Sequence, residues 1–295
     1  MNPDELLSKY AAGERDFSLA NLSSISLKQA NLREADLTEA NLSQANLWRA
    51  NLSRATLEMA NLQGAELEGA NLQGADLSSA DLMGANLDGA NLNFAGLVGA
   101  DLSGANLMIA GLVGADLNGA NLYDANLIGA NLQGANLIGA DLCQTNLSTS
   151  YLYEADLSEA NLNQVNVHRA LYNDKTKFPP EFDPLEAGAY LIAPYVSLIG
   201  INLRGVYLPG VNLHRANLSR IDLREANLIW ADLTEADLTE ADLSGANLSG
   251  ANLSGAKLDG AKLDGANLSG TTMPNGDLHN ACKIGSPERN SYKCS

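Results

Sequence analysis

Residues 115–139 read ADLNG ANLYD ANLIG ANLQG ANLIG, which is one five-residue unit written five times. The unit has an apolar residue at its centre, nearly always Leu, and it continues from Phe17 to Val167 and resumes from Leu198 to Leu278. A short fixed period over most of a 295-residue chain predicts a stacked array of equivalent units rather than a globular core.

The period of five fits neither the helical repeat of about 3.6 residues nor the alternation of a plain strand. Asn, Asp and Gly recur in nearly every unit and favour turns, so each unit is expected to contain its own turn. Four units would then close one square coil of about 20 residues, with Leu and the Ala two positions before it pointing inward. The chain is therefore predicted to be an all-β solenoid, a quadrilateral β-helix of about 12 coils joined by backbone hydrogen bonds.

The repeat divides the chain into two blocks that are separated by an insertion and flanked by two non-repeat ends. The N-terminal end begins with Pro3, Asp4 and Glu5, which suit the first turn of a helix. In the proline-rich insertion, Asp183 followed by Pro184 predicts a short helix. This insertion is interpreted as a loop packed on one continuous β-helix, with a recognition loop and a hinge as alternatives. The predicted segments are an N-terminal helical cap (1–16), a first repeat block (17–170), a non-repeat insertion loop (171–197), a second repeat block (198–278) and a C-terminal tail or cap (279–295).

Units such as Ala115-Asp116-Leu117-Asn118-Gly119 and Ala246-Asn247-Leu248-Ser249-Gly250 carry a resemblance to a known family. The chain resembles the pentapeptide-repeat proteins of the A(D/N)LXX type, which are abundant in cyanobacteria. This resemblance implies a right-handed quadrilateral β-helix, and it implies little about activity. Some proteins of the family act as DNA mimics on a type II topoisomerase, although those mimics use more Phe at the central position. The family often dimerises end to end through C-terminal coils, so the resemblance also implies a homodimer as an alternative.

The composition restricts the expected cellular location and the classes of partner. A net charge of −17 disfavours nucleic acid and anionic membranes as direct partners and permits a basic protein. The N-terminus has no basic and apolar signal-peptide pattern and no apolar run approaches a membrane span, so a cytoplasmic location is expected. Cys143, Cys282 and Cys294 are read as free thiols, with a Cys282–Cys294 bridge as the alternative.

The sequence predicts no catalytic, cofactor-binding or metal site. A filled square coil offers no concave site for catalysis. The glycines follow the period of five rather than a phosphate-binding pattern, and no His or Cys pair has zinc spacing. The protein is therefore predicted to be no enzyme but a non-enzymatic interaction scaffold or regulatory binding protein with an unidentified protein partner.

The alternative function is that of an acidic mimic that modulates a nucleic-acid enzyme such as a type II topoisomerase. No Lys or Arg occurs between Ala55 and His168. Along the predicted stack, the number of acidic residues per unit length of this stretch approaches that of the charges on duplex DNA, about one per 1.7 Å. Against this function, the acids fall on all four sides of the predicted coil. They are Glu58, Glu66, Glu68, Asp76, Asp81, Asp88, Asp101, Asp116, Asp124, Asp141, Glu154, Asp156 and Glu159.

Apolar residues at outward positions gather in the middle of the first block and form the first candidate partner contact. Gly96 and Gly111 replace the usual Asn or Asp there, and Met108 and Ile128 occupy equivalent positions one predicted coil apart, so they are expected to stack. The alternative is a scatter of single exposed apolar residues, as on any protein surface. The residues assigned to this contact are Phe94, Val98, Met108, Ile109, Val113, Ile128 and Ile138.

A second candidate contact follows the insertion, where a basic cluster precedes an acidic run from Glu225 to Asp242. Such a bipolar surface would orient a partner electrostatically. The alternative is pairing of the opposite charges between neighbouring coils, which contributes little at a surface. The residues assigned to the second contact are Arg204, Arg215, Arg220, Arg224 and Trp230.

Overall fold

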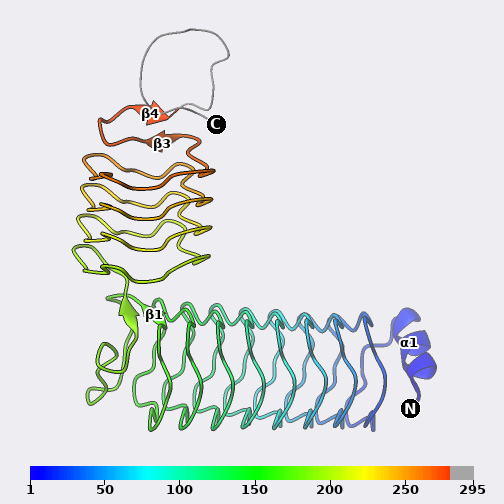
Figure 1. The fold of residues 1–295 in the computed structure, drawn as a ribbon. Coiled ribbons are helices and arrows are strands. Elements are labelled where there is room, and N and C mark those ends of the chain that lie inside the picture. The colour runs from blue at the N-terminus through cyan, green and yellow to red at the C-terminus, as the bar shows by residue number, and fades with distance from the viewer. Residues whose placement is uncertain (280–295) are drawn as a thin grey trace, which may run out of the picture. The chain divides into compact units, whose positions relative to one another are not determined.

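The computed structural model describes residues 1–279, and the chain divides into two compact units. The first unit runs from Met1 to Tyr190 and the second begins at Leu191. Each unit contains a stack of nearly square coils, which Figure 1 shows as successive loops of the ribbon. The predicted C-terminal tail or cap lies outside the described residues except for its first residue.

The coils are joined by parallel bridges between residues 20 positions apart, such as Asn86 with Asn106 and Asn106 with Asn126. Beside each bridge the central Leu donates its N–H to the next coil, as Leu107 does to the carbonyl oxygen of Asn126 at 2.7 Å. This register confirms that four five-residue units make one coil. It satisfies the backbone without long strands, because each side of the coil contributes a single bridge residue. The total number of coils stays a prediction.

The interior consists mainly of two kinds of side chain, as predicted. The central Leu and the preceding Ala of successive units, such as Leu107 and Ala105, are fully buried throughout the middle of the first block. Because Leu stacks on Leu and Ala on Ala, the narrow interior is filled without a mixture of side-chain sizes. Two inward positions carry Thr instead, Thr145 and Thr271, and each hydroxyl donates to a backbone carbonyl oxygen of the preceding coil, at 2.6 and 2.7 Å.

The four sides of the first block are named here by their bridge residues in the middle coils. Every fourth unit returns to the same side, so residues 20 apart form a column along the stack. Side 1 contains Asp81, Asp101 and Asn121, side 2 contains Asn86, Asn106 and Asn126, side 3 contains Asn91, Gly111 and Asn131, and side 4 contains Asp76, Gly96 and Asp116.

Helix α1 (Pro3–Ala11) lies at the N-terminal end of the first unit (Figure 1). The Asn2 side chain caps it by accepting a hydrogen bond from the N–H of Glu5 at 2.9 Å, and Pro3 occupies the first turn. Leu6 is completely buried, and the Tyr10 hydroxyl donates to the carbonyl oxygen of Arg33 at 2.9 Å. The apolar face of α1 therefore covers the open end of the first coils, where backbone edges would otherwise be free to pair with another chain.

The insertion contains strands β1 (Leu171–Tyr172) and β2 (Tyr190–Leu191), which pair with each other. The short helix predicted after Asp183 is wrong, because residues 184–188 form turns. The Asp183 carboxylate does accept from the N–H groups of Leu185 and Glu186, at 2.9 and 3.1 Å, as an N-cap would. Gly188, with a φ of +89°, ends the segment after a single turn.

The described part of the second unit ends with an antiparallel hairpin rather than another parallel bridge. Strand β3 (Thr271–Thr272) pairs with β4 (Leu278–His279), and Thr272 also forms a parallel bridge with Asn252 of the preceding coil. The change from parallel to antiparallel pairing occurs at the turn that contains Pro274, Asn275 and Gly276. Strand β4 thus covers one side of the last described coil.

Candidate functional site

Each corner of the coil requires a left-handed backbone conformation at the last residue of the five-residue unit. Glycine supplies this conformation at many corners without steric cost. Phe94 and Ile109 adopt it with φ values of 60° and 50°, and both side chains are mostly exposed, at 62% and 65%. A β-branched residue such as Ile109 is costly in this region, and residues held in such strain cluster at functional sites.

Residues 108–114 turn one corner of the first block without a single polar side chain on the outside. The outward positions are occupied by Met108, Ile109, Gly111, Val113 and Gly114, because Ala110 and Leu112 point into the core. In the usual unit the bridge position carries Asn or Asp, whereas Gly111 contributes no polar group of its own. The amide of Asn93, from the preceding coil, lies over it, with Oδ1 3.1 Å from its Cβ position. The segment therefore exposes only apolar side chains and backbone.

A second apolar segment, residues 94–99, lies one coil earlier on side 4. Its outward positions are Phe94, Gly96, Val98 and Gly99. The Phe94 ring lies over Gly114, so that a Cβ atom there would meet the ring carbons Cδ1 and Cε1 at 2.9 Å. Phe94 thus joins the two segments at a shared corner. The outward residues of 94–99 and 108–114 are called the apolar ridge below.

The predicted first contact is only partly one surface. The N–H of Phe94 donates to the carbonyl oxygen of Val113, and that of Ile109 to the carbonyl oxygen of Ile128, both at 2.9 Å, so these pairs are direct neighbours. Met108 and Ile128 follow each other in one column of side 2, as predicted. Ile138 is separate, because Asn118 lies between it and Val98 in their column of side 4. The Asn118 amide donates to the carbonyl oxygen of Ile138 at 3.1 Å.

Asn93 compensates for the polar group that is missing at Gly111. In most units the Asn or Asp oxygen accepts from the N–H two residues later, as Asp141 does from Cys143 at 3.1 Å. Gly111 has no such oxygen, and the N–H of Val113 donates instead to Asn93 Oδ1 of the preceding coil at 2.8 Å. Sequence reasoning missed this residue, because its role depends on a side chain reaching across coils.

Replacing Asn93 with Ala is expected to lower the free energy of unfolding by about 1 kcal/mol, because the partly buried N–H of Val113 loses its acceptor. Gly111→Asn in the same background should restore most of that loss by placing an amide oxygen two residues before Val113. Urea denaturation of both variants checks this, with Gln133→Ala, an exposed residue of the same column, as the control. Equal losses for Asn93→Ala and Gln133→Ala would contradict the assignment.

Three carboxylates lie next to the apolar ridge. In the column of Gly96, Asp76 precedes it and Asp116 follows it, each joined to it by a parallel bridge. Asp88 precedes Met108 in the column of side 2, and its Oδ1 is buried without a hydrogen-bond partner. None of the three belongs to the ion pairs found among residues 1–279. The ridge is therefore bordered by negative charge that no described cation neutralises.

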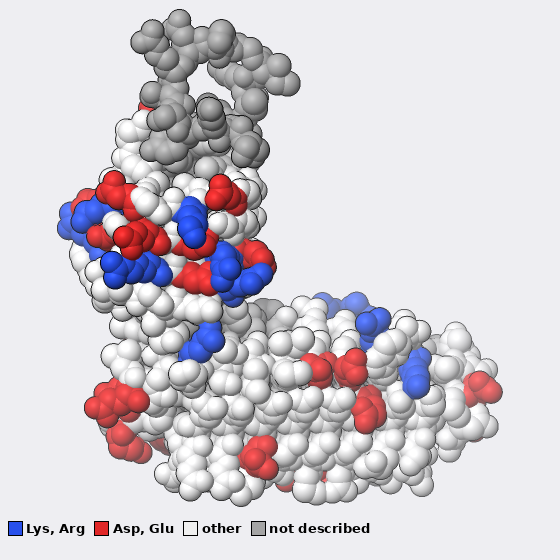
Figure 2. Space-filling model, in the orientation of Figure 1, with Lys and Arg blue, Asp and Glu red and all other residues white. Residues whose placement is uncertain are grey.

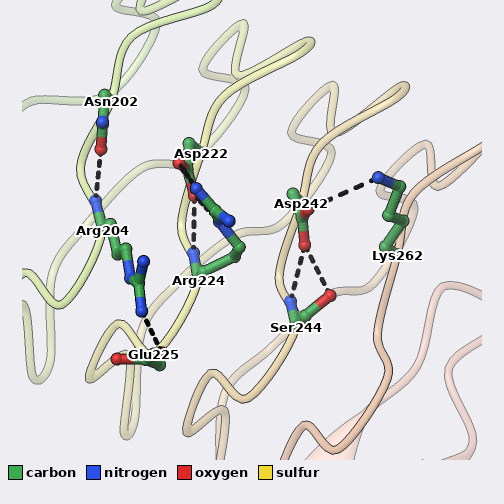
Figure 3. A network of polar contacts seen from close by, with 8 residues as sticks. All are labelled: Asn202, Arg204, Asp222, Arg224, Glu225, Asp242, Ser244 and Lys262. Carbon is green, nitrogen blue, oxygen red and sulfur yellow. Dashed lines mark hydrogen bonds and ion pairs between the residues drawn. The ribbon is translucent and has the colours of Figure 1, made fainter.

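The arginines of the second candidate contact form ion pairs with acids of the same compact unit, the second one. Arg215 Nε contacts Glu235 at 2.7 Å, and both residues occupy one corner column, 20 positions apart. Arg224 holds Asp222 through two nitrogens, with Nε–Oδ1 and Nη2–Oδ2 distances of 2.9 and 2.6 Å (Figure 3). The remaining pairs are Arg204–Glu225 at 2.6 Å, Arg220–Glu240 at 2.8 Å, Lys257–Asp237 at 3.2 Å and Lys262–Asp242 at 3.6 Å.

These pairs make the alternative interpretation of the second contact the better one. Figure 2 shows blue and red side chains interleaved over the second unit, rather than a basic area next to an acidic one. Trp230 stands apart from the pairs, with 73% of its surface exposed and a φ of 59°. Its ring lies over Gly250, whose Cβ position is 2.5 Å from Trp230 Cε3.

The paired acids give the second unit a pH-dependent stability. The hydrogen bond from Arg224 lowers the pKa of Asp222, and the one from Arg215 lowers the pKa of Glu235. Side-chain hydrogen bonds from Thr239 and Ser244 have the same effect on the pKa of Asp237 and of Asp242. A carboxyl group with a lowered pKa stabilises the fold above its ordinary pKa, and this stabilisation is lost as the pH falls through the lowered value.

We therefore expect the second unit to lose stability as the pH falls from about 6 to about 3. Trp230 lies in the second unit and Trp48 in the first, so a Trp48→Phe variant allows urea unfolding of the second unit to be followed by fluorescence. Glu235→Gln should reduce the drop in the urea midpoint between the two pH values, because that position no longer titrates. An identical drop in both proteins would contradict the role of the Arg215–Glu235 pair.

The cysteines and histidines form no recognisable centre in the part of the chain that the structure describes. Among residues 1–279 no group of three His, Cys, Asp or Glu side chains is arranged to hold a metal ion. Cys143 is a free, half-buried thiol, and the alternative Cys282–Cys294 bridge lies outside the described residues. No helix in the described chain has the length and apolar character to span a bilayer.

Comparisons with known proteins agree with the repeat geometry. The sequence pattern of the family described as "Pentapeptide repeats" matches the chain between residues 16 and 169 and between residues 195 and 282. A comparison with curated proteins gave no significant match.

Three solved structures illustrate the similarity. HetL, a pentapeptide repeat protein involved in heterocyst differentiation regulation from the cyanobacterium Nostoc sp. strain PCC 7120, is 34% identical, with 95% of this chain and all of HetL covered and a TM-score of 0.41. The Nostoc PCC 7120 pentapeptide repeat protein alr5209 is 25% identical over 64% of this chain and 95% of its own, with a TM-score of 0.16. QnrB1, a plasmid-mediated fluoroquinolone resistance protein, is 20% identical over 61% and 89%, with a TM-score of 0.49.

The family assignment rests on the repeat match, which spans most of the chain. The fold of this family is a right-handed β-helix solenoid, in agreement with the parallel bridges between residues 20 apart. The chain therefore belongs to the pentapeptide-repeat family.

Proposed function

We propose that this protein is a non-enzymatic scaffold or regulatory binding protein that binds a partner protein through the apolar ridge. The observation that carries the proposal is the segment 108–114, which turns a corner with only apolar side chains outside. At the same corner the large, β-branched side chain of Ile109 occupies a left-handed position that glycine and mostly polar residues occupy at the other corners. An exposed, mainly apolar surface of this extent is typical of an interaction site.

The proposal includes a location in the cytoplasm and a protein partner rather than nucleic acid or a membrane. The net charge of −17 supports this choice, because it repels phosphate-bearing surfaces. The filled interior of fully buried Leu and Ala supports a non-enzymatic role, since the coil itself leaves no room for a substrate.

Affinity capture from a lysate of the source organism tests the proposal, with the wild-type chain compared with a Met108→Glu/Val113→Glu variant. We expect at least one protein to be retained by the wild type and lost by the variant. The matched control is Met83→Glu/Tyr123→Glu, which adds the same charge at exposed positions of side 1. Identical sets of proteins on the wild type and on the ridge variant would overturn the assignment of the surface.

The second candidate function is the acidic mimic, which is favoured by the absence of Lys and Arg between residues 55 and 168. Its weakness is geometric, because the thirteen acids of this stretch are spread over all four sides and only Glu154 belongs to side 3. The dependence of binding on salt concentration distinguishes the two functions. Binding by mimicry should weaken steeply as ionic strength rises, whereas an apolar contact should change little.

A further inference from the structure

We propose that the partner segment that docks on the apolar ridge is basic and amphipathic, with apolar side chains that contact the ridge and Lys or Arg side chains beside them. This inference rests on the proposed function and adds the chemistry of the partner. It follows from three observations: the extent of the ridge, the position of its carboxylates outside any ion pair, and the unsuitability of the ridge for a second copy of the chain.

The ridge extends across a corner, with the Asn93 amide of the preceding coil lying over Gly111 between its two ends. Phe94 lies over Gly114 at one end of the segment 108–114. At the other end, Ile109 lies between two glycines of its own column, with its Cγ2 3.3 Å from the Cβ position of Gly129 and its Cδ1 3.9 Å from that of Gly89. Large apolar side chains are thus raised above small neighbours, which makes them accessible to a partner from several directions.

Carboxylates border the ridge on two sides of the coil. Asp76 and Asp116 bracket Gly96 on side 4, and Asp76 Oδ1 is 3.5 Å from the Cβ position of that glycine. On side 2, Asp88 precedes Met108, and its buried Oδ1 has no hydrogen-bond partner. A cationic group placed beside the ridge would meet a carboxylate in either direction.

The contrast with the second unit shows that this charge is not balanced within the chain. There, several acids at comparable outward positions have an Arg or Lys in contact, as Glu235 and Asp222 do. Between residues 55 and 168 the chain has no Lys or Arg at all. No Lys or Arg of this stretch is available to the ridge carboxylates, and charge complementarity therefore favours a basic partner.

A second copy of the chain fits the ridge poorly. In a symmetric dimer each surface meets itself, so Asp76, Asp88 and Asp116 would face the same acids across the contact. Like charges placed opposite each other in a contact are unfavourable. The basic residues that could relieve this, such as Arg215 and Arg220, are already paired with acids.

The apolar part of the inference is tested with Phe94→Asn/Ile109→Asn in the full chain. Asn keeps the net charge and tolerates the left-handed corner better than Phe or Ile, so thermal stability should be unchanged or higher. The probe is a synthetic amphipathic peptide of Leu and Lys, measured by fluorescence anisotropy beside the same peptide with Glu for Lys. We expect the Lys peptide to bind the wild type, and to bind the variant about tenfold more weakly, as for loss of a central contact.

The charge part is tested with Asp76→Asn/Asp88→Asn/Asp116→Asn. The matched control is Asp81→Asn/Asp101→Asn/Asp141→Asn, which removes the same charge from side 1, opposite Gly111. Asn can keep the backbone contacts that Asp76 and Asp141 make through their side-chain oxygens. The ridge triple variant should bind the Lys peptide clearly more weakly than the control triple variant.

The outcomes are distinct. Equal weakening by both triple variants would show attraction to the overall negative charge and would overturn the inference. A preference of the ridge for the Glu peptide would overturn the basic chemistry and leave the proposed function standing. Concentration-dependent self-association in sedimentation velocity that Phe94→Asn/Ile109→Asn abolishes would identify a second copy as the occupant and overturn the inference. If that variant also left lysate capture unchanged, the proposed function would fail with it.

Discussion

Replacing Leu87 with Ala is expected to lower the free energy of unfolding by about 3 kcal/mol, the middle of the range for a buried Leu that leaves a cavity. Leu87 is fully buried, with the Leu side chains of the coils before and after it in the same column. The narrow interior cannot collapse around the missing atoms, because each neighbouring Leu is held by a backbone hydrogen bond to the next coil. Urea denaturation of the full chain measures the effect.

Leu162→Ala is the matched control in the same compact unit. Leu162 occupies the equivalent central position but is only half-buried, so its loss leaves less apolar surface uncovered and a smaller cavity. We expect its effect to be less than half of that at Leu87. Equal effects at the two positions would show that stability does not follow the burial of the Leu column.

Gly250→Ala is expected to destabilise the second unit by about 3 kcal/mol, the sum of a left-handed backbone penalty and a steric clash. The φ of Gly250 is +68°, and an added Cβ would lie 2.5 and 2.6 Å from Cε3 and Cζ3 of Trp230. These atoms belong to the rigid indole ring, so the whole ring must move to make room. Unfolding is followed by circular dichroism, since the change alters the surroundings of the tryptophan.

Two further variants distinguish the backbone penalty from the steric clash. Gly265→Ala has the same backbone penalty, with a φ of +69°, but nothing lies within 4 Å of its Cβ position. Its free energy of unfolding should fall only by the backbone penalty, about 1 to 2 kcal/mol. Trp230→Gly combined with Gly250→Ala removes the clash, so the cost of Gly250→Ala in that background should fall to the value at Gly265. A cost that stays the same without the indole ring would contradict the steric explanation.

Most of the fold could be predicted because the period of five acts on every coil alike. The columns of Leu and Ala, and the register of four units per coil, follow from the need to bury one face of each unit and to satisfy its backbone. The N-cap at Asp183 is not enough on its own to predict whether a helix follows it. A cap supplies one or two hydrogen bonds, and Gly188 follows before a second turn can form.

The candidate sites were predicted less completely. Arg215 and Glu235 occupy equivalent positions in successive coils, as do Arg220 and Glu240, so the sequence already held the signal that these charges lie over one another. The pairing of Arg224 with Asp222 had no such signal, because both belong to one five-residue unit and the contact depends on how the side chain folds back. The position of Asn93 over Gly111 likewise depends on a rotamer.

One coil contains four five-residue units. This ratio restricts how a chain of this kind can change its length during evolution. Deleting one unit leaves every later Leu and Ala inside, so the core tolerates it. The same deletion turns all later outward residues by a quarter of the circumference relative to the earlier ones, so a loss between Phe94 and Gly114, or between Trp230 and Gly250, would separate that pair. Lineages that keep a working surface should therefore gain or lose four units at a time after the surface has formed. Single-unit changes should be confined to places such as the insertion, where Asp156 pairs with Lys177 instead of Thr176 and the count has already been reset.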